Sequence, residues 1–411
     1  MNASSLPDPE TTRRRKILSA SGFAHFIHDG FTDAVYVLLP LWREAFGLSF
    51  AEVGILKTCV TVGLAGFQVP AGFLAERFGE RAVLVCGTVF AGAGFILLAH
   101  ADNMGMLAVF LFLCGVGCGT QHPLASALVS RAYDGGRRRA ALGTYNFTGD
   151  LGKIVIPFSV AAIAGIAGWQ TGAMVYGGVG IVAAIAIYLV LRHLDVGGPA
   201  MPELEKKVGK SDQRKGGWGG WGIGDRRGFS ALSAISIVDC SSRFGFLTFL
   251  SFLLIEKGAE TGSVGFAFTL VFAGGAAGKL ICGLIAERVG ILRTVVLTEI
   301  ASVSLIIAVV YMPLLATLIF LPALGVVLNG TSSVLYGTVG DFVDPHRQAR
   351  AFGLFYTFGV GAGAAAPFAY GLFSDHFGLT AGLIVLAASI LLVLPLCLVL
   401  RPSLTAAEAA E

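Results

Sequence analysis

Two aspartates and two histidines lie within a stretch that is otherwise apolar enough to cross a membrane. Residues 17–42 read ILSASGFAHFIHDGFTDAVYVLLPLW, with His25, His28, Asp29 and Asp33 near the middle. A carboxylate at the centre of a bilayer costs about 2.5–3.5 kcal/mol on insertion scales, so both aspartates need a compensating role. On a helix, His25, Asp29 and Asp33 follow at intervals of four residues and share one face. We expect this face to form one wall of a polar pathway.

Asp29 is the best candidate to carry a coupling proton. Burial favours the protonated form of a carboxyl group, and a nearby cation favours the ionised form. An aspartate that gains and loses a cation during a transport cycle therefore binds and releases a proton. Asp33 is the second candidate, because it lies further from the middle of the stretch. His25, His28 and His122 are candidate relays, since imidazole titrates near neutral pH.

Further charged residues occur as close pairs inside other apolar stretches. Asp150 and Lys153 are three residues apart, and Asp239 and Arg243 are four apart, so each pair shares a helix face. In one interpretation each pair neutralises itself in a static network. In the other, Arg243 and Lys153 attract an anionic group of a substrate, because Arg suits bidentate binding of carboxylate or phosphonate. The other candidate substrate-contacting residues are polar or aromatic: Tyr36, Gln121, Asn146, Asn329, Tyr336, Tyr356 and Lys279.

Glu299 lies in an apolar stretch of its own, and we expect it to be structural and outside the pathway. The seven cysteines lie mostly inside apolar stretches, which favours small buried side chains over disulfides or a metal site.

The elements that position these residues are predicted to be membrane-spanning helices. Hydrophobic residues make up 55% of the 411-residue chain and charged residues only 13%, with a mean hydropathy of +0.77. Charged residues are about 25% of an average soluble domain, so the composition indicates an integral membrane protein. Apolar windows predict twelve spans, at about 17–42, 53–75, 81–100, 105–131, 139–166, 170–192, 229–256, 262–286, 292–312, 314–341, 348–373 and 378–400.

The distribution of positive charge orients the chain. Residues 193–228 form the one long polar stretch, a basic linker with a Gly/Trp run, and most of the 29 Lys and Arg residues fall on the side that holds this linker and both termini. The predicted opposite side has only Arg43 and Lys257 in its loops. Positive charge marks the cytoplasmic side. We therefore expect a multi-pass protein of the cytoplasmic (inner) membrane with both termini in the cytoplasm, and a linker that lies on lipid headgroups.

One loop sequence recurs half a chain later. Residues 72–81 read GFLAERFGER and residues 283–293 read GLIAERVGILR, an offset of 211 positions. The offset predicts two parallel halves: an N-terminal six-helix bundle at 1–192, the linker at 193–228 and a C-terminal six-helix bundle at 229–411. Repeated halves are typical of transporters, whose substrate site lies near the midplane between them.

The loop also carries a resemblance to the major facilitator superfamily. GFLAERFGERAVL (72–84) resembles that family's signature G-x-L-A-D-R-x-G-R-K-x-x-x-L, with Glu76, Glu80 and Arg81 in place of Asp, Arg and Lys. The resemblance implies an all-α membrane protein with 12 transmembrane helices in two pseudo-symmetric six-helix bundles. It also implies a gating role, in which Arg77 and Arg81 bind Glu76 and latch the cytoplasmic side. The candidate gating residues are Gly72, Glu76, Arg77, Gly79, Arg81, Glu287 and Arg288.

A narrower resemblance is to fosmidomycin-resistance-type transporters. It rests on AHFIHDGFTDAVYVLLPLWREAFGLSFAEVGIL (24–56), with its His-x-x-His-Asp pattern, and on GVGCGTQHPLASALVSRAYDGGRR (115–138). Those proteins export drugs in exchange for protons, and in the family the first, fourth, seventh and tenth spans line the cavity. The substrate does not follow from the resemblance, but Arg243 and Lys153 favour a small amphiphilic or anionic compound, and we expect no cofactor. The resemblance implies a proton-coupled exporter. It leaves open uptake or exchange of an organic anion.

Other function classes fit the sequence less well. A membrane sensor or channel would not need the repeated halves with paired loops. An enzyme would need a nucleophile, metal cluster or cofactor site near a membrane face, and none is evident. No phosphate-binding loop is present, which argues against ATP as the energy source. We expect protons, a small-molecule substrate and the lipid bilayer as partners of a monomer, and no nucleic acid.

Overall fold

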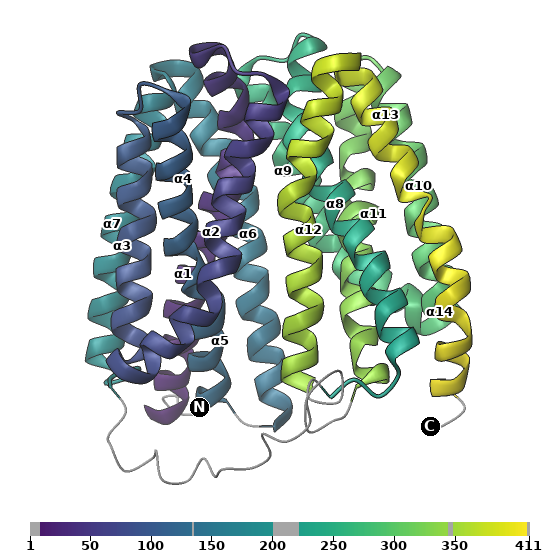
Figure 1. Cartoon of the computed structure of the whole chain (residues 1–411). Helices are drawn as coiled ribbons and strands as arrows, with labels where there is room; N and C mark the ends of the chain where they lie inside the picture. The colour runs from purple at the N-terminus through teal and green to yellow at the C-terminus, as the bar shows by residue number, and fades with distance from the viewer. Residues whose placement is uncertain (1–8, 134, 200–221, 344–347, 409–411) are drawn as a thin grey trace, which may run out of the picture. The chain divides into compact units, whose positions relative to one another are not determined.

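The computed structural model describes residues 9–133, 135–199, 222–343 and 348–408, and nearly all of them are helical (Figure 1). Within these ranges the one β-type feature is an isolated antiparallel bridge between Ile223 and Val343. The predicted all-α class is therefore confirmed. The lysines and arginines of the linker at 206–215 lie outside the described residues.

The helices follow one another with short connections. In chain order they are α1 (Pro9–Phe46), α2 (Phe50–Phe78), α3 (Glu80–Leu98), α4 (Met104–Gly119), α5 (Gln121–Ala132), α6 (Gly135–Ala167), α7 (Trp169–His193), α8 (Arg226–Glu256), α9 (Thr261–Val289), α10 (Ile291–Tyr311), α11 (Leu314–Thr338), the short 3₁₀ helix η2 (Val339–Phe342), α12 (Gln348–Phe377), α13 (Leu379–Ile390) and α14 (Val393–Glu408).

Eleven helical segments among the described residues are long and apolar enough to cross a membrane. All of the predicted spans after the first correspond to them. The first predicted span lies in α1, which has 38 residues and is long enough. It is not among the eleven because His25, His28, Asp29 and Asp33 lower its mean hydropathy. The helix that departs from membrane composition is thus the one with the candidate proton-binding residues.

Two predicted spans are interrupted, each within the four residues before a proline. The span at 105–131 breaks at Thr120, between α4 and α5, and the span at 378–400 breaks after Ile390, between α13 and α14. Proline has no N–H to donate to the carbonyl four residues earlier. Pro123 leaves the carbonyl of Gly119 without this bond, and Pro395 does the same to Leu391. Both interruptions therefore have a local cause.

The described residues group by their internal contacts into two compact units. The first unit contains α1 as far as Val35 and the chain from Cys59 through α7. The second unit contains the segment Tyr36–Thr58, which is the end of α1 and the start of α2, together with α8 to α14. The three-part division predicted along the sequence, at 192 and 228, stays a prediction.

Each unit has its own helix packing (Figure 1). In the first unit α3 packs against α4 and α7, and α6 packs against α7. In the second unit α9 packs against α11, and α8 packs against α12 and α14. Apolar clusters fill the space between these helices, one around Leu84 and Leu128 in the first unit and one around Phe229 and Leu335 in the second.

The same close helix crossing occurs in both units. A Cβ atom on Gly63 of α2 would lie 2.5 Å from the carbonyl oxygen of Phe112 in α4. A Cβ atom on Gly274 of α9 would overlap the carbonyl of Pro322 in α11. Small residues let membrane helices approach closely. Gly63 and Gly274 are 211 positions apart, which is the offset of the repeated loop.

The beginning of α8 is fixed by a cap and by the end of η2. The carboxylate of Asp225 accepts hydrogen bonds from the backbone N–H groups of Arg227 and Gly228, at 2.9 and 3.1 Å. Burial would raise the pKa of Asp225, but these bonds and one from Ser403 hold it below its ordinary value. The N–H of Gly224 also donates to Phe342, at 2.9 Å. The cap sets the start of the helix that carries Asp239 and Arg243.

Candidate functional site

Asp29 of α1 is the centre of a cluster of ionisable side chains in the first unit. Its side chain is 10% exposed. Its Oδ2 lies 3.2 Å from His25 Nε2 and 3.3 Å from Lys153 Nζ, and its Oδ1 lies 3.4 Å from His122 Nε2. The spacing of His25 and Asp29 predicted their contact. Lys153 of α6 and His122 of α5 come from elsewhere in the chain.

Glycines in α6 bring Lys153 to Asp29. A Cβ atom on Gly149 would lie 2.5 Å from His25 Nε2, and one on Gly152 would overlap the backbone of Phe26. Larger side chains at these positions would push α6 away from α1. The close approach allows the ammonium group to contact a carboxylate on the neighbouring helix.

The hydrogen bonds of His25 imply a shared proton. Its Nδ1 lies 2.9 Å from the carbonyl oxygen of Tyr145, which can only accept, so Nδ1 carries hydrogen. The other nitrogen, Nε2, then faces Asp29 Oδ2 at 3.2 Å. A neutral imidazole and an ionised carboxylate would place two lone pairs against each other in this contact. One additional proton, on His25 or on Asp29, converts it into a hydrogen bond.

Lys153 has two carboxylates within reach. Its Nζ lies 3.3 Å from Asp29 Oδ2 and 4.0 Å from Asp33 Oδ2. Asp150 also acts on it electrostatically. The static interpretation of the sequence paired Lys153 with Asp150 on the same helix, whereas the structure places its ammonium group against α1. A small movement of Lys153 between the two aspartates would change the charge that faces the proton between His25 and Asp29.

The same cluster offers the donor atoms of a metal site. One ligand atom each from His25, Asp29 and His122 lie within 4.8 Å of one another. Two imidazoles and a carboxylate are ligands that transition metals accept. However, the ammonium of Lys153 contacts the same Oδ2 atom as His25 and would repel a divalent cation. The geometry therefore favours a proton over a metal ion.

His28 is held away from this exchange by Thr88. The hydroxyl of Thr88 donates to the carbonyl of Leu84 at 2.8 Å, so it must accept the bond from His28 Nε2, also at 2.8 Å. The remaining nitrogen, Nδ1, has no hydrogen-bond partner in the part of the chain that the structure describes, and the residue is only 1% exposed. A buried imidazole with this pattern is neutral. The geometry thus favours a structural role for His28 over the predicted relay.

Tyr145 supports the cluster and was not predicted from the sequence. Its ring lies 4.3 Å from the ring of His25, and its hydroxyl accepts a 2.6 Å hydrogen bond from Gln121. Gln121, a predicted substrate contact, is completely buried and is engaged in this bond. Asn146, the next residue, is exposed.

The second unit contains the other predicted charge pair, Asp239 and Arg243 of α8. Arg243 donates to Ser332 Oγ at 2.8 Å and to Cys240 Sγ at 3.3 Å. Among the described residues no ion pair joins Asp239 directly to Arg243, although the two interact electrostatically. The structure thus describes an electrostatic interaction without a direct contact, where the static interpretation expects a local pair. The guanidinium has five N–H groups and keeps donors for a further acceptor.

The predicted aromatic and polar contacts of the second unit differ in exposure. Tyr36 is 2% exposed and stacks on Phe268, with the ammonium of Lys57 3.8 Å from its ring centre. Tyr336 and Tyr356 are 47% and 41% exposed. Tyr36 and Tyr356 both interact electrostatically with Arg243.

Two predicted residues lie on facing helices of this unit. Asn329 of α11 packs against α9, since a Cβ atom on Gly275 would lie 2.8 Å from its Nδ2. The exposed Lys279 of α9 accepts a hydrogen bond at its backbone carbonyl from Ser333. Lys57, which is buried, was not among the predicted site residues; its position inside an apolar span was the available signal.

The loop between α2 and α3 has a different ion pair from the one predicted. Arg131 contacts Glu80 at 2.7 Å, and Arg81 donates to the carbonyl of Leu191 at 3.4 Å. Glu76 and Arg77 are exposed, and among the described residues neither takes part in an ion pair. The predicted binding of Glu76 by the two arginines is therefore not seen.

The glycines of this loop have different surroundings. Gly79 has φ +81°, and a Cβ atom on it would lie 2.5 Å from Gly198. Gly72 has open space around it, so close packing does not explain that glycine. The equivalent Glu287 and Arg288 at the end of α9 are exposed.

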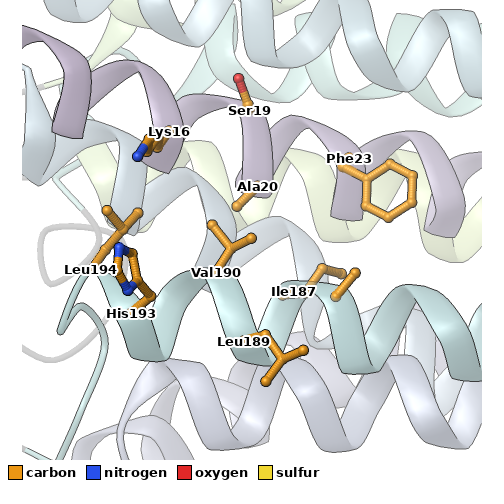
Figure 2. A pocket seen from close by; sticks show the side chains of 10 residues that line it. Lys16, Ser19, Ala20, Phe23, Ile187, Leu189, Val190, His193 and Leu194 are labelled. Carbon is orange, nitrogen blue, oxygen red and sulfur yellow. The ribbon is translucent and has the colours of Figure 1, made fainter.

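A groove between α1 and α7 lies apart from the charged cluster. Figure 2 shows Phe23 and Ala20 of α1 opposite Ile187 and Val190 of α7, with Lys16 and His193 at one end. Its lining is mostly apolar and does not include Asp29 or Lys153. It is thus a surface groove and not the candidate site.

Comparisons with known proteins agree with the fold. A family model described as Major Facilitator Superfamily matches residues 21–253 and 232–410. The chain is 24% identical to the fosmidomycin resistance protein of Escherichia coli over 382 residues, which is 89% of both chains. It is 25% identical to the gentisate transporter of Corynebacterium glutamicum, over 92% of this chain and 88% of that one. It is also 25% identical to a probable sulfoacetate transporter of Cupriavidus necator, over 67% of this chain and 65% of that protein's length.

Solved structures show the same architecture. A bacterial homologue of the human lysosomal transporter Spinster superposes with a TM-score of 0.76 at 16% identity, covering 95% of both chains. A nucleoside transporter superposes with a TM-score of 0.75 at 11% identity, over 94% of this chain and 99% of that one. At these identities the likeness concerns the fold alone.

Proposed function

The chain belongs to the Major Facilitator Superfamily, and from this premise we propose that it is a proton-coupled secondary transporter that exports a small amphiphilic or anionic organic compound. As a member of a transporter family it is not an enzyme. The observation that carries the proposed coupling is the contact between His25 and Asp29, which requires a proton, next to a lysine that contacts the same carboxylate.

Proton release would follow from the position of Lys153. When its ammonium group lies against Asp29, as in this structure, the positive charge favours the ionised carboxylate and leaves the proton on His25, from which it can be released. When it lies against Asp33, Asp29 is left in a buried site without that cation, which favours protonation. His122, whose side chain is 32% exposed, is the candidate that passes the proton to water. Asp33 is the alternative partner of Lys153 and not the primary carrier.

The substrate would be bound through Arg243 in the second unit. Its charge and its remaining N–H groups suit a carboxylate, sulfonate or phosphonate. The exposed rings of Tyr336 and Tyr356 would contact the apolar part. The protein would act as a monomer in the inner membrane with both termini in the cytoplasm.

The test is proton-driven transport by the purified protein in lipid vesicles. Asp29→Asn should reduce transport driven by a pH gradient to the rate of empty vesicles, because Asn cannot bind the proton. Exchange of labelled for unlabelled substrate at equal pH should remain. Asp102→Asn, in an exposed loop, is the matched control. Proton-driven transport by Asp29→Asn at the wild-type rate would show that the assignment of Asp29 is wrong.

Uptake of an organic anion is the second candidate. Two relatives are named as transporters of gentisate and sulfoacetate, which are organic anions at neutral pH. A growth screen in a strain that lacks its own exporters, with phosphonates and aromatic acids in the panel, would identify the substrate. The direction of proton movement in vesicles then separates the two candidates. Protons that move against the substrate indicate export by exchange, and protons that move with it indicate uptake.

A further inference from the structure

Glu299 is a buried carboxyl group without a complete set of partners. It lies in α10 and is 3% exposed. Among the described residues its Oε1 has no hydrogen-bond partner. Thr331 of α11 lies next to the carboxyl group, but its hydroxyl donates to Thr298 Oγ1 at 2.8 Å. The sulfur of Cys397 in α14 is a further neighbour and belongs to an apolar cluster with Val295. An ionised carboxylate in such surroundings is strongly disfavoured unless it is paired.

The charged neighbours of Glu299 come from α8. Asp239 and Arg243 both act on it electrostatically. Asp239 is itself only 3% exposed. Two buried carboxyl groups thus interact electrostatically with one guanidinium, while Arg243 uses two of its N–H groups on Ser332 and Cys240. The thiols of Cys240 and Cys397 and the phenols of Tyr36 and Tyr356 are also near these residues, and all four are neutral at neutral pH. The buried ammonium group of Lys57 lies beyond them, against the ring of Tyr36.

Charge balance decides the protonation of this group of residues. With both carboxyl groups ionised, Asp239, Glu299 and Arg243 would together have a net charge of one negative unit. With one proton bound, the set is neutral. Asp239 lies one helical turn from Arg243 on α8, whereas Glu299 lies on a different helix among apolar side chains. Glu299 is therefore the group that gains more from being neutral.

We propose that Glu299 is a proton-binding site in the second unit and that it carries a proton at neutral pH. This proton is distinct from the one between His25 and Asp29 in the first unit. Its consequence for transport rests on the proposed function: with Glu299 neutral, an anion that reaches Arg243 meets one carboxylate instead of two. The presence of the proton does not depend on that function.

Infrared difference spectroscopy of the full chain in lipid tests the proposal without transport. The wild-type protein at neutral pH should show the C=O stretch of a protonated carboxylic acid that disappears in Glu299→Gln and persists in Glu287→Gln, whose residue is exposed at the end of α9. Glutamine keeps the size and polarity of the protonated form, so Glu299→Gln is expected to fold. A spectrum unchanged by Glu299→Gln would overturn the proposal.

Isotope labelling assigns the proton and needs no variant. Glu299, at 3% exposure, is the one buried glutamate among the described residues. Protein labelled with ¹³C in the glutamate carboxyl groups should show the band shifted, whereas labelled aspartate should leave that band in place. The band should also vanish at alkaline pH and return on acidification. A band that moves with labelled aspartate instead would place the proton on Asp239 or Asp29 and overturn the assignment to Glu299.

Discussion

Arg243 is predicted to determine the affinity for an anionic substrate. A hydrogen bond to a charged group contributes about 1.5–3 kcal/mol, which corresponds to roughly 10–100-fold in affinity. Arg243→Ala should weaken substrate binding by that factor, and Arg243→Lys should recover part of it, because lysine keeps the charge and loses the planar fork. Equilibrium binding to the protein in detergent, with the substrate from the growth screen, measures both. An unchanged affinity in Arg243→Ala would remove the anion-binding role.

A variant of Thr88 tests whether His28 has a structural role or relays a proton. Thr88→Val removes the acceptor of His28 Nε2–H and leaves a buried donor unsatisfied. This should lower the free energy of unfolding by about 1–3 kcal/mol, while proton-driven transport continues in the folded protein. Thermal unfolding in detergent and vesicle transport give the two readings. Thr144→Val, at an exposed position of α6, is the control. Loss of proton coupling without loss of stability would support the predicted role of His28 as a proton relay.

Local spacing predicted part of the candidate site, and tertiary packing determined the rest. The contact of His25 with Asp29 follows from the helical repeat, which is a property of adjacent turns. The carbonyl of Tyr145 that fixes the tautomer of His25 lies 120 positions away and leaves no pattern in the sequence. Tyr36 follows Asp33 by three residues, so helix periodicity places it near the same face as Asp29, yet Tyr36 is buried against Phe268. Residues on the same face of a helix can therefore contact different neighbouring helices, and the spacing alone does not determine which.

At the level of helices, alanine substitutions of the two glycines in the loop at 72–81 are predicted to change the free energy of unfolding in opposite directions. Gly79 has φ +81° and lies against Gly198, so Gly79→Ala should cost about 1–2 kcal/mol for the left-handed backbone, and more for the steric overlap. Gly72 lies inside α2 with open space around it, so Gly72→Ala should gain up to about 1 kcal/mol of helix propensity. Thermal unfolding of the two variants in detergent measures the difference. Equal effects would contradict the assignment of the turn to Gly79.

The helices themselves could be predicted from apolar windows because a bilayer demands about 20 apolar residues from each span. Their interruptions could not be placed in the same way, since hydropathy does not report a missing N–H. Pro123 and Pro395 were visible in the sequence, but Pro157 and Pro367 lie within continuous helices. Whether a proline breaks a helix depends on how its neighbours satisfy the freed carbonyl, which is a matter of packing.

At the level of the whole molecule, the two exceptions to the charge distribution have local explanations. Lys257 follows α8 and donates to the carbonyl groups of Val310 and Met312 at the end of α10. Burial lowers the pKa of Lys257, and the adjacent Glu256 opposes this. The guanidinium of Arg43 lies 4.1 Å from the ring centre of Phe50. Both cations predicted for the charge-poor side therefore have partners within the second unit, and these partners explain why the two residues lie outside the predicted cytoplasmic side.

The orientation of the chain follows from the remaining charges and can be tested with reporter fusions. Positive residues near membrane spans stay on the cytoplasmic side. α1 begins with Arg13, Arg14, Arg15 and Lys16 and ends at Phe46, so its two ends differ strongly in charge. A fluorescent protein fused after Glu411 should fluoresce, because it folds in the cytoplasm, and alkaline phosphatase there should be inactive. Phosphatase inserted after Gly47, between α1 and α2, should be active. The opposite pattern would place the loop around Gly79 outside the cell and exclude the cytoplasmic gating role proposed for Arg77 and Arg81.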